Sequence, residues 1–157
     1  MWAVPVTRTP LGRGYRHVEI SGRPQTDDTL QKMRPLVLVV DDTPLARLTL
    51  RKTLEHHGYD VIEAGSTEEA IRVYRDQWPD VVTMDILMDR HNGIVAIQAL
   101  LHIDNDAKIV VCSATADKSF VEGAITLGIE AYLNKPISEE RLVAAVAAAL
   151  EHRRSGG

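Results

Sequence analysis

The feature of this sequence that most limits its fold is a series of short apolar runs that alternate with helical segments. The runs occupy residues 36–40, 60–64, 81–84, 108–112 and 131–133. Each is nearly continuous, as in strands that are buried on both faces of a sheet. Strands that alternate with helices form parallel sheets with helices on both sides. The pattern therefore predicts an α/β fold, a doubly wound sheet of five parallel strands with five helices.

Capping residues mark the helix boundaries in the same region. Thr43 followed by Pro44 is typical of a helix start, because proline suits the first helical position and a threonine oxygen can accept a free backbone N–H. Comparable capping residues precede three of the later helical segments, at Ser66, Asp117 and Ser138. These positions divide the chain into strand and helix segments of ordinary length.

The chain divides into one domain and two short ends. Residues 1–35 contain four prolines and three glycines and show no helical or strand period. We therefore expect a disordered or loosely packed N-terminal extension there. The folded domain is expected at 36–152 and a C-terminal tail at 153–157. Met33, just ahead of the first apolar run, is a candidate for the natural start of the protein.

Charge and composition argue against several classes of protein. The formal net charge is −4, and residues 36–157 hold twelve Lys and Arg against nineteen Asp and Glu. An acidic domain is a poor ligand for nucleic acid, so we expect no direct nucleic acid binding. The single Cys112 cannot form an internal disulfide and fits a reducing compartment. Without an apolar run of about 18 residues or a secretory signal, we expect a cytoplasmic protein that is not inserted in a membrane.

Polar residues with useful chemistry follow four of the five predicted strands. They are Asp41 and Asp42, Asp85, Ser113 and Lys135. Ligands of an open parallel sheet bind beyond the carboxyl ends of its strands, where these side chains would meet. Each residue alone is more typical of a turn, a cap or the surface. Together, on separate strands, they predict a single site.

The charges of this predicted site indicate what it binds. Three carboxylates repel one another and Lys135 offsets only one, so either some are protonated or a cation is bound. Oxygen ligands without a nearby cysteine or histidine favour a hard cation, and an open octahedral site suits Mg²⁺. With the cation on Asp42, Asp85 can act as nucleophile toward a phosphoryl group to which Ser113 donates a hydrogen bond. The residues thus indicate an aspartyl-phosphate site.

Four segments of the sequence carry a resemblance to a known family. They are "VLVVDDTP", "VVTMDILMDRHNG", "VVCSATAD" and "GIEAYLNKPI", in that order. At these segments the chain resembles the receiver domain of bacterial response regulators, of the single-domain, chemotaxis type. The resemblance covers about residues 36–150. It implies a flavodoxin-like sheet with strand order 2-1-3-4-5.

The resemblance also assigns the phosphoacceptor and the metal ligands. Asp85 would accept a phosphoryl group that a sensor histidine kinase or a phosphotransfer protein carries on a histidine. Mg²⁺ would be held by Asp85 and Asp42, by Asp41 mainly through a coordinated water, and by the backbone carbonyl of Leu87. The chain would then be a stand-alone response regulator of a two-component phosphorelay, a phosphorylated switch and not an enzyme with a separate substrate.

The remaining implied residues are those of the switch. Lys135 would pair with the phosphoryl group, and Ser113 would turn toward it. Tyr132 would then move inward and alter the surface that a downstream protein target recognises. The peptide bond between Lys135 and Pro136 would be cis, which proline makes accessible.

Two positions depart from the usual pattern of the family. Asp89 stands where proline is common, four residues after the phosphoacceptor, and Ile137 stands where phenylalanine is usual. Without the usual proline we expect a more mobile loop, and we expect the extra carboxylate at position 89 to alter metal affinity or dephosphorylation. The chain also ends shortly after its last predicted helix, so we expect it to act through a protein partner.

Three alternatives remain at this point. A phosphatase of the haloacid dehalogenase type also uses an aspartyl nucleophile, but its first strand carries Asp-x-Asp, whereas Asp41 and Asp42 are adjacent. A flavodoxin shares the fold, but two carboxylates after its first strand would repel the flavin phosphate. The last alternative is a receiver fold that serves only as an interaction module, without phosphorylation.

Overall fold

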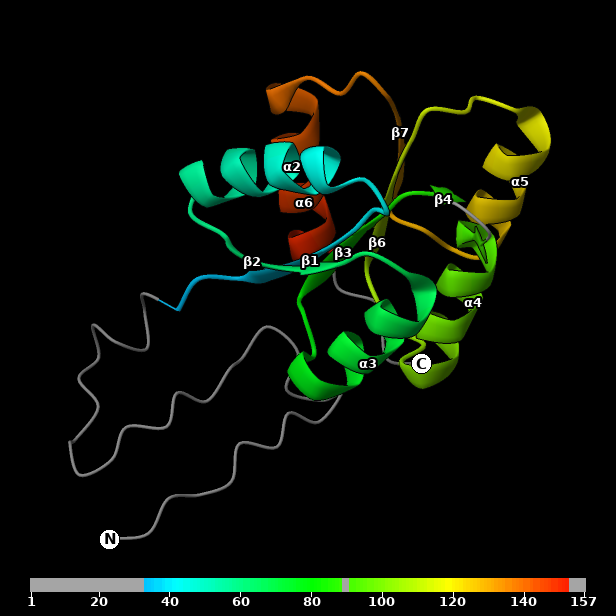
Figure 1. Ribbon diagram of the computed structural model, residues 1–157, viewed down its shortest axis with the longest axis horizontal. Helices are drawn as coiled ribbons and strands as arrows, with labels where there is room; N and C mark the ends of the chain where they lie inside the picture. The colour runs from blue at the N-terminus through cyan, green and yellow to red at the C-terminus, as the bar shows by residue number, and fades with distance from the viewer. Residues whose placement is uncertain (1–32, 89–90, 153–157) are drawn as a thin grey trace, which may run out of the picture.

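The computed structural model describes residues 33–88 and 91–152, and within them five parallel strands form one sheet. The order across the sheet is β2-β1-β3-β6-β7 (Figure 1). These strands are β1 (Leu36–Val40), β2 (Asp60–Ala64), β3 (Val81–Met84), β6 (Ile109–Ser113) and β7 (Ala131–Asn134). Numbered along the chain as the five strands of this sheet, their order is 2-1-3-4-5. The predicted fold class and topology are confirmed.

Helices cover both faces of the sheet (Figure 1). One face is covered by α2 (Pro44–His56) and α6 (Glu139–Glu151), and the other by α3 (Thr67–Gln77), α4 (Gly93–Ile103) and α5 (Lys118–Thr126). Successive residues of a strand point to opposite faces, so a central strand between two helical layers is apolar at nearly every position. All five residues of β1 are buried, with Val37 and Val39 on the α2–α6 side and Leu38 and Val40 on the other.

The predicted caps form at three helices and fail at one. Ser66, Asp117 and Ser138 each accept a backbone N–H in the first turn of the helix that follows. Thr43 does occupy the N-cap position of α2, but its side chain makes no capping hydrogen bond. Its hydroxyl instead donates to Oδ1 of Asp42 at 3.5 Å, and its backbone N–H donates to Oδ1 of Asp41 at 2.9 Å. The start of α2 is therefore tied to the carboxylate pair after β1.

A short strand pair between β3 and α4 was not predicted. The segments β4 (Leu87–Met88) and β5 (His91–Asn92) pair antiparallel, and α4 begins directly afterwards at Gly93. The N–H of Gly93 donates to the carbonyl of Ile86 at 2.8 Å. A Cβ atom on Gly93 would lie 2.4 Å from the Cα of Ile86 and 2.5 Å from the carbonyl oxygen of Asp85. The absence of a side chain thus lets α4 start against the backbone that follows Asp85.

Some predictions concern residues that the structure does not describe. Most of the expected extension at 1–35, the tail at 153–157 and the unusual Asp89 lie outside the described residues. Within 33–88 and 91–152, no helix has both the length and the apolar character needed to cross a bilayer.

The close approach at Gly93 leads to a stability prediction. Gly93→Ala should lower the free energy of unfolding by about 2 kcal/mol, because the new methyl group meets rigid backbone. Gly123→Ala in α5 is the matched control, since its Cβ would meet only Cδ1 of Ile94 at 3.9 Å. That variant should be neutral or more stable, because alanine favours helix. Urea denaturation of both variants measures the difference, and equal stabilities would contradict this account of Gly93.

Candidate functional site

Three carboxylates gather at the carboxyl edge of the sheet. Asp41 and Asp42 follow β1 and Asp85 follows β3, and these strands are neighbours in the sheet. One oxygen from each residue can be chosen such that all three lie within 4.8 Å of one another. Asp41 and Asp85 are buried, with 1% and 6% of their surface exposed, and Asp42 is half-buried. The convergence expected from the sequence is therefore present.

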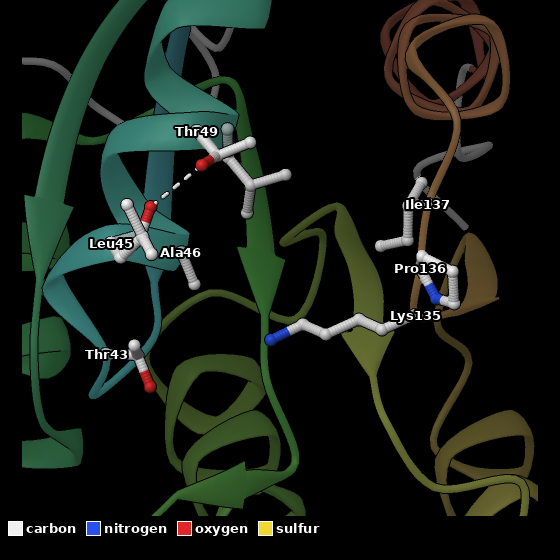
Figure 2. Close-up of a pocket in the computed structure, with 8 residues that line it drawn as sticks. Thr43, Leu45, Ala46, Thr49, Lys135, Pro136 and Ile137 are labelled. Atoms are coloured by element: carbon white, nitrogen blue, oxygen red, sulfur yellow. Dashed lines mark hydrogen bonds between the residues drawn. The ribbon is translucent and has the colours of Figure 1, made fainter.

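Lys135 joins this cluster from the far side of the sheet. Its Nζ lies 2.7 Å from Oδ2 of Asp41 and 3.3 Å from Oδ2 of Asp85. The residue follows β7, and its N–H donates to the carbonyl of Ser113 at 2.8 Å, which fixes the start of the side chain. Figure 2 shows the extended side chain crossing toward the first turn of α2. The peptide bond to Pro136 is cis, as the resemblance implied.

Burial and charge act in opposite directions on these groups. Burial raises the pKa of Asp85 above its ordinary value, and the charge of Asp41 adds to this, while Lys135 and the N–H of Leu87 oppose the rise. Burial alone would lower the pKa of Lys135, but the carboxylates of Asp41 and Asp85 outweigh it and raise that pKa. Lys135 therefore stays positively charged and offsets part of the repulsion between the carboxylates.

The donor atoms of the cluster suit a hard divalent cation. All three side chains offer carboxylate oxygens, and an all-oxygen set favours Mg²⁺ or Ca²⁺ over softer metals. Three negative charges against the single positive charge of Lys135 leave an excess that a divalent cation would neutralise. Asp41, Asp42 and Asp85 are thus a cluster that could hold a metal ion. The predicted contribution of the Leu87 carbonyl stays a prediction.

The two carboxylate oxygens of Asp85 have different partners. Oδ1 accepts the N–H of Leu87 at 2.9 Å, while Oδ2 faces Lys135. Both oxygens are thereby fixed in direction at the end of β3. The Leu87 side chain is 46% exposed and points no polar group toward the site.

Thr115 connects the predicted switch residues. The carbonyl oxygen of Thr115 accepts two hydrogen bonds, from the Tyr132 hydroxyl and from Nδ2 of Asn134, both at 2.8 Å. The N–H of Thr115 donates to Oγ of Ser113 at 3.3 Å, and Ser113 is fully buried. Burial raises the pKa of Tyr132, which therefore keeps its proton. The sequence pointed to Ser113 and Tyr132 but not to Asn134.

Arg47 is a neighbour of the site that sequence reasoning missed. Its Nη1 donates to the backbone carbonyl of Asp41 at 2.6 Å, and its Nε pairs with Glu63 of β2 at 3.0 Å. Ala64 and Gly65, at the end of β2, offer no side-chain polar group. An arginine one turn after the N-cap of α2 was a signal, but its partner Glu63 follows only from the pairing of β1 with β2.

A cavity of about 390 Å³ lies beside Lys135, between the first turns of α2 and the chain after β7. Figure 2 shows its lining, which is largely apolar and includes Leu45, Ala46, Pro136 and Ile137. Leu45 is 71% exposed on this face. Lys135 thus borders both the carboxylate cluster and an apolar recess at the surface.

Known proteins similar to this chain include a curated chemotaxis protein and a solved response regulator, each matched over most of its length. Chemotaxis protein CheY of Thermotoga maritima is 41% identical over 111 residues, which are 70% of this chain and 92% of that protein. A solved two-component response regulator of the LuxR family from Aurantimonas sp. SI85-9A1 has 32% identity and a TM-score of 0.72, covering 78% of this chain and 89% of that one.

A third relative was solved in a phosphorylated state. This response regulator protein from Burkholderia pseudomallei contains a phosphorylated aspartic acid, a calcium ion and citrate. It has 29% identity and a TM-score of 0.67, covering 71% of this chain and 66% of that one. The family model of the response regulator receiver domain matches residues 37–147. The chain therefore belongs to the response regulator receiver domains, the phosphorylation-dependent signalling modules of two-component systems.

Proposed function

We propose that Asp85 accepts a phosphoryl group from a phosphohistidine of a sensor histidine kinase or a phosphotransfer protein, and that the change is passed to a downstream protein target. The observation that carries this proposal is the position of the buried Asp85 carboxylate, in contact with Lys135 and beside Asp41 and Asp42. The family membership removes the phosphatase and flavodoxin alternatives. A receiver fold without phosphorylation remains an outcome that the experiment below distinguishes.

Each residue of the site has a separate role in such a phosphoryl transfer. A carboxylate oxygen of Asp85 forms the new bond to phosphorus while the bond from phosphorus to the histidine nitrogen breaks, and that nitrogen keeps the bonding electrons and takes up a proton. Lys135, already 3.3 Å from Oδ2 of Asp85, pairs with the phosphoryl oxygens. Ser113 donates a hydrogen bond to another of them. A bound Mg²⁺ supplies charge neutralisation for the phosphoryl group.

The proposed ligands of that Mg²⁺ are Asp41, Asp42, Asp85 and the carbonyl of Leu87. The relative from Burkholderia pseudomallei, with its phosphorylated aspartic acid and calcium ion, supports both the modified residue type and a divalent cation. Asp42 is half-buried beside Asp41, and this supports its role as a metal ligand that a cation can reach from solvent.

Ser113 and Tyr132 are the proposed switch. Once Ser113 turns to the phosphoryl group, its hydrogen bond with the N–H of Thr115 is lost, and the segment that also binds the Tyr132 hydroxyl can move. The downstream protein would read the resulting surface. We place this activity in the cytoplasm, in a folded domain at 36–152 with the extension at 1–35 and the tail at 153–157 outside it.

The central prediction is that the full-length protein takes up one phosphoryl group from acetyl phosphate with Mg²⁺, measured by intact mass. Asp85→Asn should abolish the added mass, and a chelator should prevent it in the wild type. Asp76→Asn is the matched control, because this aspartate is 61% exposed on α3 and should leave labelling unchanged. Absence of labelling of the wild type, or equal labelling of the Asp85 variant, would overturn the proposal.

A second prediction concerns stability and pH. Because the pKa of Asp85 in the folded state lies above its ordinary value of 3.8, the folded state binds more protons between the two values, so this group reduces stability as the pH rises. Without divalent cations, Asp85→Asn should raise the free energy of unfolding at neutral pH, because the amide carries no charge to bury.

That gain should shrink as the pH falls toward the ordinary value, because protonation of the wild-type carboxyl removes the charge that burial disfavours. Urea denaturation in the presence of a chelator, repeated across this pH range, measures it. A variant no more stable than the wild type at neutral pH, or a gain that grows on acidification, would contradict the role of burial at Asp85.

A third prediction concerns the lifetime of the phosphoryl group. Leu87, two residues after Asp85, cannot orient an attacking water, so self-dephosphorylation should be slow. Leu87→Asn introduces an amide that can hold such a water and should shorten the lifetime, whereas Leu87→Met should leave it unchanged. Loss of the added mass after removal of the donor gives both rates. A longer lifetime in the asparagine variant would show that this reasoning is wrong.

A further inference from the structure

The guanidinium of Arg47 lies between the carboxylate loop and the end of β2. Nη1 donates to the carbonyl oxygen of Asp41 at 2.6 Å, and Nε lies 3.0 Å from Oε1 of Glu63. The side chain of Arg47 is only 19% exposed and that of Glu63 26%. A largely covered arginine that makes two directional contacts has little freedom to move.

The carbonyl that Arg47 holds belongs to the peptide that joins Asp41 to Asp42. The other polar groups of Asp41 are already assigned. Its N–H donates to the carbonyl of Ala64, and its carboxylate meets the N–H of Thr43 and the amino group of Lys135. Because a peptide unit is planar, fixing its carbonyl also fixes the direction in which the next residue leaves. The contact with Arg47 therefore sets the direction of Asp42 relative to Asp41.

The end of β2 leaves room for this guanidinium. A Cβ atom on Gly65 would lie 3.1 Å from Nη1 of Arg47, which is tighter than an ordinary contact. The glycine thus permits the arginine to lie flat against the backbone after β2, and Glu63 holds it there.

We propose that Arg47 is a positioning residue, held by Glu63, that orients the Asp41–Asp42 peptide so that both carboxylates are arranged in advance for a divalent cation. It does not touch the cation or the phosphoryl group. This role rests on the proposed function, because it concerns the same cation. Groups that orient metal ligands typically change metal affinity by roughly 10-fold to 100-fold when removed.

An electrostatic role and a positioning role of Arg47 predict opposite changes in Mg²⁺ affinity when the residue is removed, so the two roles can be distinguished. If Arg47 acted only as a nearby positive charge, its removal would make the acidic cluster bind cations more tightly. If Arg47 positions the carboxylates, its removal makes binding weaker. The sign of the change in Mg²⁺ affinity therefore decides between these roles.

Arg51 provides a matched control on the same helix. It also pairs with Glu63, and it donates to the backbone carbonyl of Val61, but the structure records no contact between it and the carboxylate loop. Arg47→Met and Arg51→Met each remove one positive charge, one ion pair with Glu63 and one hydrogen bond to a backbone carbonyl. Arg51→Met also removes an ion pair with Glu55 one turn along the helix, which contributes little to stability at an exposed site. Their effects on folding should be similar, and only the first removes a contact with Asp41.

The experiment measures Mg²⁺ binding by calorimetry and unfolding by urea with a chelator, for the full-length wild type and both variants. Arg47→Met should weaken Mg²⁺ binding by about 10-fold. Arg51→Met should leave it unchanged or slightly tighter, at a similar loss of stability. Binding by Arg47→Met that equals or exceeds that of the wild type would overturn the positioning role.

Arg47→Lys keeps the charge and gives a test that does not depend on the fold tolerating methionine. An ammonium group cannot reproduce the fork that reaches Glu63 and Asp41 together, so binding should again be weaker, by a smaller factor. Unchanged binding in this variant would count against the role. If the wild type is labelled on Asp85 and Arg47→Met binds Mg²⁺ as tightly as the wild type, this inference alone is rejected. If the wild type neither binds Mg²⁺ nor is labelled, the proposed function is rejected with it.

Discussion

The contact on which the site depends is that of the Lys135 amino group with two buried carboxylates. Asp41 and Asp85 lie at the ends of neighbouring central strands, where both carboxylates are buried close to each other and burial raises the pKa of Asp85. The lysine reaches them from the chain after β7, which is an edge strand of the sheet. It therefore reduces a local electrostatic cost and links the edge of the sheet to its centre. The two apolar cores, not the site, stabilise the fold.

Most of the fold and the main site residues could be predicted because they depend on local signals. A strand buried on both faces is almost entirely apolar, as in β1, β3 and β6, whose residues are all buried. In a parallel sheet the residue after each strand faces the same edge, so Asp85, Ser113 and Lys135 could be grouped without knowing any distance. The family resemblance then supplied the strand order and the chemistry, and the family model confirmed the resemblance.

The features that sequence reasoning missed depend on pairings between distant segments. Glu63 holds Arg47 because β1 and β2 are neighbours, with Val39 opposite Glu63, and no local pattern indicates that register. Thr43 stands in a capping position, yet its hydroxyl is directed to the carboxylate of Asp42. The β4–β5 pair has only two residues on each side, too few for a period to be recognised. In each case the local structure depends on a contact in space that the sequence pattern does not reveal.

The pair of hydrogen bonds at the Thr115 carbonyl has a consequence for how Tyr132 can move. A carbonyl oxygen has two lone pairs, and both are used here, one by Tyr132 and one by Asn134. If the tyrosine ring rotates away, the asparagine amide still satisfies the carbonyl, so no backbone acceptor is left without a donor. Only the hydroxyl itself must find a new partner or water. In the proposed switch, movement of the Tyr132 ring would therefore cost less free energy than if it left the Thr115 carbonyl without a donor.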